Sequence, residues 1–407
     1  MYAEHLKHVN RKLSVILSLC FNAMLIHNYM PDVFMKTIIV PIVKDKKGDI
    51  SSSDNFRPIA ITCIISKVFE IIILKRHSAV LETTGNQFGF KHCHGTEHSI
   101  FTLKQVIDFY SSHCSPVYLC FIDLSKAFDR VDHSILFTKL LKRNVPVLIV
   151  RLLQTWYCSQ TFVIRWNKCI SSPFTVSNGV RQGGILSPIL FNVFIDDLSL
   201  LLRNSFYGCH INEDCFNHIV YADDTVLLAT SPVALQNLIN ICLDFIDEHH
   251  LVINKKKTKC MVVLPKELKE IHIPAFYIRS SPILQVVQEK YLGVIIKSSQ
   301  DDDETILKEM RSLYARGNIV LKKFKKCSDH VKVQLFKSYC SSFYSCSLWS
   351  SYTNSRLKSL RVAFNNIFRS LFRVSRRDGV SQNLLARGMS CFNVNGRKRG
   401  LSFTYRL

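Results

Sequence analysis

The sequence predicts an α+β fold in which helices cover one face of a sheet. Runs of β-branched and aromatic residues such as VYLCFIDL (117–124) alternate irregularly with segments whose apolar residues recur every three or four positions. A short hairpin pattern, HIVYADDTVLLA (218–229), stands among them. From about residue 300 the pattern becomes helical and basic. These observations predict an α+β core followed by a second, smaller helical unit.

The individual elements follow from the same patterns. Strands are expected at 37–43, 56–62 and 117–124, and as a pair within 161–180. Helices are expected at 62–82, directly after the strand at 117–124, and at 187–204 and 232–250. Pro188 stands near the start of one of these helices, where proline suits the first turn. The charged stretch between the first two strands is expected to be an exposed loop.

The composition favours a globular protein with a polyanionic partner. Lys and Arg outnumber Asp and Glu by 53 to 31, and residues 311–407 contain 20 Lys and Arg but only two acids. Such a local excess of positive charge is typical of nucleic-acid binding, although a solvated basic helical surface is the alternative. The 15 cysteines show no CxxC spacing, which fits reduced thiols better than a secreted disulfide framework.

No apolar run reaches the roughly 18 residues of a membrane-spanning helix. The apolar stretch LSVILSLCFNAMLI (13–26) lacks a small-residue cleavage site, so an amphipathic helix is expected there and not a signal peptide. We therefore expect a protein of the nucleus, the cytoplasm or both, without membrane association. His92, Cys93, His94 and His98 superficially form a metal cluster, but they are too crowded for tetrahedral zinc.

Three aspartates are the candidate metal ligands. Asp223 and Asp224 interrupt an apolar run at the tip of the predicted hairpin, and Asp123 ends an apolar strand. Ionised carboxylates in such positions are costly unless cations compensate them. Three convergent acids could bind two Mg²⁺ ions, or Mn²⁺, and support attack of a primer 3′-hydroxyl on a nucleotide α-phosphate. A second pair, Asp196–Asp197, lies in a helical pattern and is expected to face solvent.

Several blocks taken together resemble the reverse transcriptases of non-LTR (LINE-type) retrotransposons. They are NFRPIAI (55–61), FGFKHCHGT (88–96), FIDLSKAFDRVDH (121–133), NGVRQGGILSPILF (178–191), YADD (221–224), INKKKTKCMVV (253–263) and KYLGVII (290–296). Their order and spacing match the family along roughly residues 30 to 300. Within the class, the chain is most similar to the CR1/Jockey-like elements.

The resemblance implies a right-hand polymerase fold of fingers, palm and thumb. It divides the chain into an N-terminal helical run-up at 1–30, fingers and palm at 31–297, a basic helical thumb-like region at 298–375 and a tail at 376–407. It also makes Asp123, Asp223 and Asp224 the catalytic, metal-binding acids. Lys257 would donate a proton or neutralise charge near the pyrophosphate.

The resemblance gives further residues a role in nucleotide or template binding. Arg57 would contact the triphosphate or the template, with a surface arginine as the alternative. Phe128 would lie beneath the incoming sugar and favour deoxynucleotides, with a core aromatic as the alternative. The other assignments are Gln182 and Gly183 at the nucleotide-side turn, Ser187 and Pro188 at the template, and Tyr291, Leu292 and Gly293 at the turn that grips the primer end. Gly184 needs no such role, because a tight turn alone would explain it.

The resemblance therefore implies an RNA-directed DNA polymerase that uses an RNA template, a DNA primer and dNTPs. Family polyproteins also carry an endonuclease, and none is recognisable here. The chain is thus expected to be a fragment whose endonuclease is supplied elsewhere. The alternative is a catalytically inactive relic whose basic thumb still binds a duplex. A maturase-like role has no supporting feature.

Overall fold

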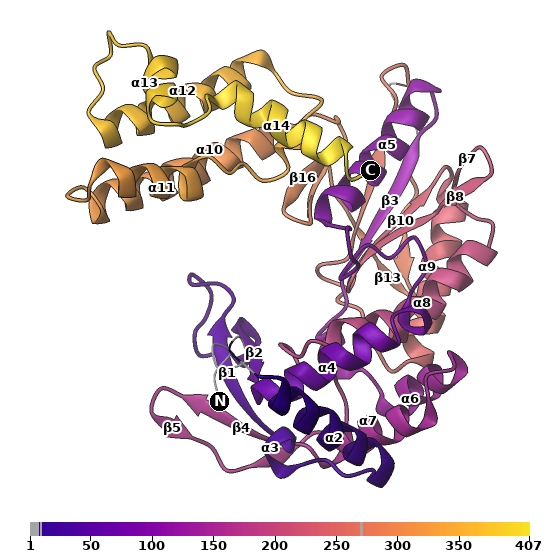
Figure 1. Cartoon of the computed structure of the whole chain (residues 1–407). Helices are drawn as coiled ribbons and strands as arrows, with labels where there is room; N and C mark the ends of the chain where they lie inside the picture. Colours follow the sequence, from indigo (N-terminus) through magenta and orange to yellow (C-terminus); the bar gives the residue numbers. More distant parts are fainter. Residues whose placement is uncertain (1–7, 9, 269–271) are drawn as a thin grey trace.

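The computed structural model describes residues 8, 10–268 and 272–407. Part of the predicted N-terminal run-up, residues 1–7 and 9, lies outside this range. The ribbon forms an arc that is open toward the left in Figure 1, with an N-terminal sheet and a set of C-terminal helices at its two ends and a central sheet between them. The mixture of helices and sheets confirms the predicted α+β class.

The described helices are α2 (Arg11–His27), α3 (Asp32–Met35), α4 (Ile64–Arg76), α5 (Thr96–Ser112), α6 (His133–Lys142), α7 (Val147–Ser159), α8 (Ser187–Asn204), α9 (Pro232–Glu248), α10 (Asp303–Lys323), α11 (Asp329–Cys340), α12 (Asn354–Phe372), α13 (Val380–Ala386) and α14 (Phe392–Thr404). None of them combines the length and the hydropathy that a membrane span requires.

The described strands are β1 (Lys36–Val43), β2 (Phe56–Ile61), β3 (Val117–Ile122), β4 (Thr161–Trp166), β5 (Cys169–Ile170), β6 (Phe174–Thr175), β7 (Cys209–Ile211), β8 (Asp214–Phe216), β9 (His218–Tyr221), β10 (Asp224–Ala229), β11 (Lys259–Val263), β12 (Tyr277–Ile278), β13 (Ser281–Pro282), β14 (Leu284–Gln285), β15 (Gln288–Tyr291) and β16 (Val294–Lys297). The N-terminal sheet has the order β2-β1-β4-β5, and the central sheet has the order β14-β11-β3-β10-β9.

One predicted helix begins later than expected. The helix expected directly after β3 starts only at His133, because Lys126 adopts a left-handed conformation (φ 51°) and Ala127–Arg130 form a 3₁₀ turn. The carboxylate of Asp132 then accepts hydrogen bonds from the backbone N–H groups of Ser134 and Ile135, which caps α6. The segment between β3 and α6 is therefore an irregular connection beside Asp123.

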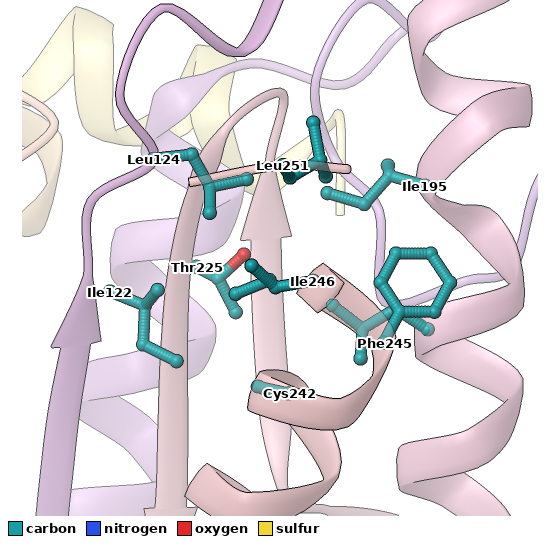
Figure 2. A pocket seen from close by; sticks show the side chains of 9 residues that line it. Ile122, Leu124, Ile195, Thr225, Cys242, Phe245, Ile246 and Leu251 are labelled. Carbon is teal, nitrogen blue, oxygen red and sulfur yellow. The ribbon is translucent and has the colours of Figure 1, made fainter. Parts of the chain in front are cut away.

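The central sheet is buried on both faces, so the prediction that helices cover one face only is wrong. One face packs against α8 and α9, and Figure 2 shows the apolar side chains between them, which leave a void of only about 10 Å³. The other face packs against α5 and the β15–β16 hairpin, and it also receives Leu348 and Phe403 from the C-terminal part of the chain. Because both faces are filled, polar side chains of β3 and β10 can reach solvent only where these strands end.

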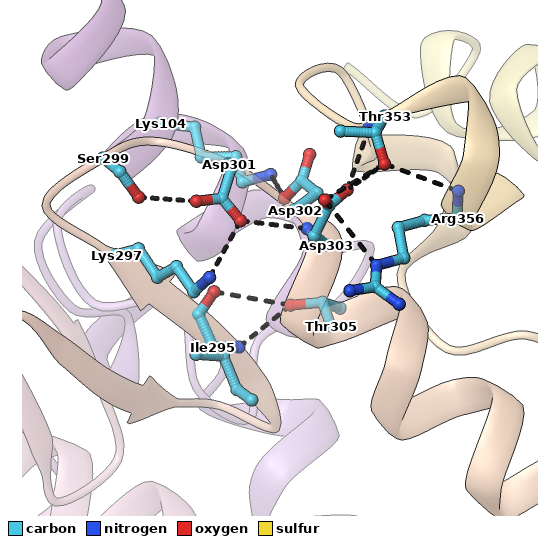
Figure 3. A network of polar contacts seen from close by, with 10 residues as sticks. All are labelled: Lys104, Ile295, Lys297, Ser299, Asp301, Asp302, Asp303, Thr305, Thr353 and Arg356. Atoms are coloured by element: carbon cyan, nitrogen blue, oxygen red, sulfur yellow. Dashed lines mark hydrogen bonds and ion pairs between the residues drawn. The ribbon is translucent and has the colours of Figure 1, made fainter.

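The helices α10 to α14 form a C-terminal helical unit with its own aromatic core, which includes Phe336, Phe364 and Phe368. A polar network joins this unit to α5 (Figure 3). The buried carboxylate of Asp302 accepts hydrogen bonds from Lys104 Nζ at 2.5 Å and from the backbone N–H groups of Ser350 and Ser351 at 3.0 and 3.1 Å. These contacts fix the start of α10 against α5 and against the loop at Ser350 and Ser351.

A buried histidine in β9 predicts how stability depends on pH. Burial lowers the pKa of His218 to about 3, whereas an unfolded histidine titrates near pH ~6.5. Its contribution to stability is therefore complete above pH ~6.5 and is lost as the pH falls, because only the unfolded chain then binds a proton. Between pH ~6.5 and ~5 the loss is about 2 kcal/mol. Urea unfolding should show a smaller pH dependence for His218→Gln, and an unchanged dependence would contradict this interpretation.

Candidate active site

The tip of the β9–β10 hairpin is a tight two-residue turn. Tyr221 pairs with Asp224 across the hairpin, so Ala222 and Asp223 form the turn and Asp224 is the first residue of β10. Ala222 has a φ of 58°, a conformation that a residue with a Cβ rarely adopts. Some neighbouring group must therefore hold the turn in place.

Gln87 and Gly89 hold this turn from the loop that precedes α5. The buried Gln87 Oε1 accepts hydrogen bonds from the backbone N–H groups of Ala222 at 3.0 Å and Gly89 at 2.8 Å. Gly89 is in contact with the turn, since a Cβ on it would lie 2.5 Å from Ala222 N. The amide of Asn192 in α8 in turn donates to the Gly89 carbonyl at 2.7 Å. Neither Gln87 nor Gly89 was predicted from the sequence, although they stand in or beside the FGFKHCHGT block.

The contact at Gly89 supports a mutational test. Gly89→Ala should displace the hairpin tip, lower stability by about 1–3 kcal/mol and slow any chemistry that needs Asp223 in place. Gly85→Ala is the matched control, because a Cβ there meets nothing within 4 Å. Unfolding curves and single-nucleotide addition rates would be compared for both variants. Equal behaviour of the two would show that the Gly89 contact does not position the turn.

Asp123 and Asp224 lie at neighbouring strand ends. Thr225 pairs with Ile122 in the antiparallel β3–β10 ladder, so the next position in the register sets Asp224 opposite Asp123. Side chains alternate along a strand, and the residues two positions inward, Phe121 and Val226, share one core cluster. The two carboxylates therefore leave the same face of the central sheet, next to the Asp223 turn.

The loop after α9 brings a lysine to these acids. The backbone N–H of Asn254 donates to the Asp123 carbonyl at 2.8 Å, and the Asp123 N–H donates to Thr258 Oγ1 at 3.3 Å. Lys257 Nζ consequently lies 3.7 Å from Asp123 Oδ2, while its side chain remains 69 % exposed. Of three consecutive lysines, Lys257 is the one that the structure pairs with Asp123.

The electrostatics show that the three acids crowd one another. Asp224 reaches solvent, yet its pKa is raised to about 6. The largest cause is burial by the surrounding protein, and the charges of Asp223 and Asp123 come next. Burial also raises the pKa of the half-buried Asp223, and the Asp123 charge adds to this effect. Within the described ranges, no three His, Cys, Asp or Glu residues stand in an arrangement that could already hold a metal ion. The donor set nevertheless fits a hard divalent cation, which prefers carboxylate oxygens and would relieve the mutual repulsion.

The predicted nucleotide-side residues gather between β2 and the central sheet. The Ala60 N–H of β2 donates to the Gln182 carbonyl at 2.7 Å, and the Gln182 side chain donates to Asp129 Oδ1 at 2.9 Å. Gly183 has a φ of 119°, and a Cβ on it would lie 2.7 Å from the Ala60 carbonyl oxygen, so glycine is required there. Burial is the main cause of the raised pKa of Asp223. Arg57, an exposed residue of β2, lies near enough that its positive charge partly offsets this rise in pKa.

Phe128 and Ser187 are less open than their predicted roles imply. Phe128 is half-buried and stacks on Phe191 with ring centroids 4.5 Å apart, so it is partly a core aromatic. Ser187 begins α8 and is buried, whereas Pro188 beside it is half-buried. The roles of these residues in binding stay predictions.

The turn predicted to grip the primer connects β15 and β16. Tyr291 pairs with Val294, so Leu292 and Gly293 form a two-residue turn in which both have positive φ, 43° and 86°. Tyr291 itself is buried, with its ring 6.0 Å from that of Phe121. The pKa of Tyr291 is raised, mainly by burial and next by the charge of Asp224. The effect of Asp224 indicates that this hairpin lies close to the acids.

A buried ion pair, also not predicted from the sequence, anchors the first part of the block NGVRQGGILSPILF (178–191). Arg181 and Glu70 of α4 are both buried and lie 2.6 Å apart, and the Arg181 guanidinium stacks 4.1 Å from the Trp156 ring. The second oxygen of Glu70 accepts the backbone N–H groups of Ile185 and Leu186 at 2.6 and 3.2 Å, just before α8. One carboxylate thus fixes both sides of the turn that contains Gln182 and Gly183.

The prediction that Asp196–Asp197 faces solvent is wrong for Asp196. Its carboxylate is buried, pairs with Arg143 and accepts the Thr84 N–H at 2.9 Å. Asp197 is half-exposed, 2.8 Å from Lys139 Nζ. The prediction fails because α8 is surrounded by other elements along most of its length, so even its polar positions meet neighbours.

The histidines at 92–98 also have local structural roles. His98 Nδ1 accepts the Gly95 N–H at 3.1 Å at the start of α5, and its Nε2 lies 3.3 Å from the Arg406 carbonyl oxygen. His94 Nδ1 lies 2.9 Å from the His92 carbonyl oxygen. The buried His98 is therefore held within the fold, whereas His94 lies at the surface.

Comparison with known proteins supplies the family. The family described as reverse transcriptase (RNA-dependent DNA polymerase) matches residues 44–296, which include all three aspartates. The chain belongs to this family. Its right-hand polymerase fold, predicted from the sequence blocks, is confirmed, and reverse transcriptases use divalent metal ions.

Several relatives of the chain are proteins of mobile elements. It is 27 % identical over 382 residues to a probable RNA-directed DNA polymerase from transposon X-element of Drosophila melanogaster, covering 89 % of this chain and 40 % of the relative. It is 26 % identical over 373 residues to the RNA-directed DNA polymerase from mobile element jockey of Drosophila funebris, covering 87 % and 39 %. The chain spans about two fifths of the length of these relatives. These matches agree with the predicted LINE-type, non-LTR reverse transcriptase. An R2 element of Drosophila melanogaster matches at 28 % identity as well, and the CR1/Jockey-like subclass stays a prediction.

Among solved structures, the chain is similar to apo telomerase from Candida tropicalis. The alignment covers 93 % of this chain and 64 % of the telomerase chain, at 12 % identity and a TM-score of 0.48.

Proposed function

We propose that this chain is an RNA-directed DNA polymerase that adds dNTPs to the 3′-hydroxyl of a DNA primer on an RNA template. The observation that carries the proposal is the placement of Asp123, Asp223 and Asp224 at adjoining ends of β3 and the β9–β10 hairpin. In the reaction the primer 3′-oxygen bonds to the α-phosphorus while the bond to the β-phosphate oxygen breaks, and pyrophosphate leaves. Charge develops on both oxygens, so the reaction needs fixed positive charge beside these carboxylates.

Asp123, Asp223 and Asp224 would hold two divalent ions, Mg²⁺ or Mn²⁺. When bound, these ions supply activation of the primer hydroxyl and stabilisation of the leaving oxygen. Lys257, 3.7 Å from Asp123, is suited to neutralise or protonate the leaving pyrophosphate. Arg57 would reach the triphosphate from β2, and Gln182 and Gly183 would line the nucleotide side. Phe128 would border the sugar, and Ser187 and Pro188 the template.

The C-terminal part supplies the charge for holding the nucleic acid. The 20 Lys and Arg against two acids after residue 310 would bind backbone phosphates of the template–primer duplex. In this proposal residues 31–297 form fingers and palm, 298–375 the thumb and 376–407 a tail. The reaction on a genomic target would take place in the nucleus, where that DNA lies.

Template-directed addition of single nucleotides tests the proposal. A DNA primer is annealed to RNA templates that differ only in the next base, and each dNTP is offered alone with Mg²⁺. Only the dNTP complementary to the next template base should be added, and dNTPs should be added in preference to NTPs. EDTA, which removes the divalent ions, should stop the extension. Addition that ignores the template base would contradict the proposal.

A further inference from the structure

The turn at Leu292–Gly293 is held by two side chains from the C-terminal part of the chain. The Tyr344 hydroxyl donates to the Leu292 carbonyl at 2.8 Å, and Lys308 Nζ of α10 donates to the Gly293 carbonyl. Both carbonyl groups of the turn therefore accept hydrogen bonds from outside the hairpin. A two-residue turn with positive φ at both positions needs no such bonds for its own geometry.

Tyr344 also reaches the start of α5. Its Oη lies 2.6 Å from Thr96 Oγ1, and because its single proton goes to the Leu292 carbonyl, the Thr96 hydroxyl is the donor. The ring of Tyr344 packs so closely on Gly293 that a Cβ there would lie 3.0 Å from it. The Tyr344 N–H in turn donates to Glu309 of α10 at 3.4 Å. The side chain of Tyr344 thus contacts the turn and α5, and its backbone N–H contacts α10.

These contacts lie beside the candidate catalytic acids. Tyr291, the residue before the turn, packs on Phe121, which is two residues before Asp123 on the same strand face. Tyr344 is 40 % exposed, so it lies at the open side of this junction and not within a core. Movement of the C-terminal helical unit would therefore be transmitted through Tyr344 and Lys308 to a turn next to Asp224.

We propose that Tyr344 and Lys308 are positioning residues that fix the primer-end turn against the catalytic acids and couple it to the C-terminal helical unit. The inference rests on the proposed polymerase function for its consequence, but the coupling itself is a property of the fold. A duplex bound by the basic helices would set the position of α10 and of Tyr344. The turn, and with it the primer 3′-end, would then be held in line with the incoming nucleotide.

The test uses the full chain and two readouts. Tyr344→Phe removes both hydroxyl contacts and keeps the ring, and Lys308→Met removes the second donor. Tyr339→Phe is the matched control, because Tyr339 is an exposed tyrosine of α11 with no side-chain hydrogen bond to the described residues. Hydrogen exchange of residues 291–296 measures the turn directly. Single-turnover addition of one dNTP, with duplex affinity measured separately, reports its effect on the reaction.

Each variant should speed exchange at 291–296 and slow nucleotide addition about 10-fold, while duplex affinity changes less than 2-fold. Because both donors act on one turn, the double variant should be slowed less than the product of the two single effects. Unchanged exchange in both variants overturns the inference, whether or not the rate falls. Faster exchange in the variants, combined with a parent chain that never extends a primer, would support the coupling and refute the polymerase proposal.

Discussion

Asp223→Asn and Asp224→Asn are each expected to slow nucleotide addition by about 10³-fold or more. Each substitution keeps the size of the side chain but removes a carboxylate charge, and with it the ability to hold a divalent ion firmly. A loss of about 4 kcal/mol of transition-state stabilisation corresponds to that factor. The raised pKa of Asp224, which is due to burial and then to the neighbouring acids, indicates that these charges repel one another in the free protein. Either amide should therefore fold at least as stably as the parent.

Single-turnover addition of one dNTP measures this effect, together with thermal unfolding and duplex binding. Asp244→Asn is the control, because Asp244 is an exposed aspartate of α9 on a helix that does not supply the predicted ligands. We expect this control to add the nucleotide at the rate of the parent. A rate for Asp223→Asn within a few fold of the parent would show that Asp223 is not needed for catalysis.

Arg181→Met is expected to have the largest effect on stability, a loss of about 3–5 kcal/mol. The substitution leaves Glu70 as an uncompensated charge in the core, where neither partner of the pair is exposed to solvent by more than 2 % of its side chain. The stacking of the guanidinium on Trp156 would also be lost. Denaturant unfolding should show a lower midpoint with an unchanged slope.

The double variant Glu70→Leu, Arg181→Met separates charge burial from positioning. Removing both charges should restore a large part of the stability, because an apolar pair needs no compensation. Nucleotide addition should be slow in the double variant, because the N–H groups of Ile185 and Leu186 lose the carboxylate that orders the turn at Gln182. Recovery of both properties together would contradict the positioning role assigned to Glu70.

The sequence was sufficient for the elements in which local pattern and chemistry agree. The hairpin was predictable because Asp223 and Asp224 interrupt a strand pattern, and the fold confirms a hairpin there. Asp123 was predictable as the end of an apolar strand, although only the β3–β10 register sets it opposite Asp224. The late start of α6 was not predictable, because the left-handed Lys126 is not a residue type that signals such a backbone.

The supporting contacts could not be read from the sequence, because they join residues far apart in the chain. Gln87 contacts Ala222 across 135 positions, and Tyr344 contacts Thr96 across 248. A glutamine or an exposed tyrosine carries no local signal of such a partner. The prediction for Asp196 failed for a related reason, because its burial depends on Arg143 and Thr84, which come from other parts of the chain.

The decisive experiment is primer extension on an RNA template with Mg²⁺ and dNTPs, comparing the purified chain with its Asp223→Asn, Asp224→Asn double variant. We expect that the parent extends the primer, that the variant does not, and that both bind the duplex with similar affinity. If neither protein extends the primer while both bind it equally, the claim is contradicted. The YADD turn would then be an inherited remnant on a nucleic-acid-binding scaffold.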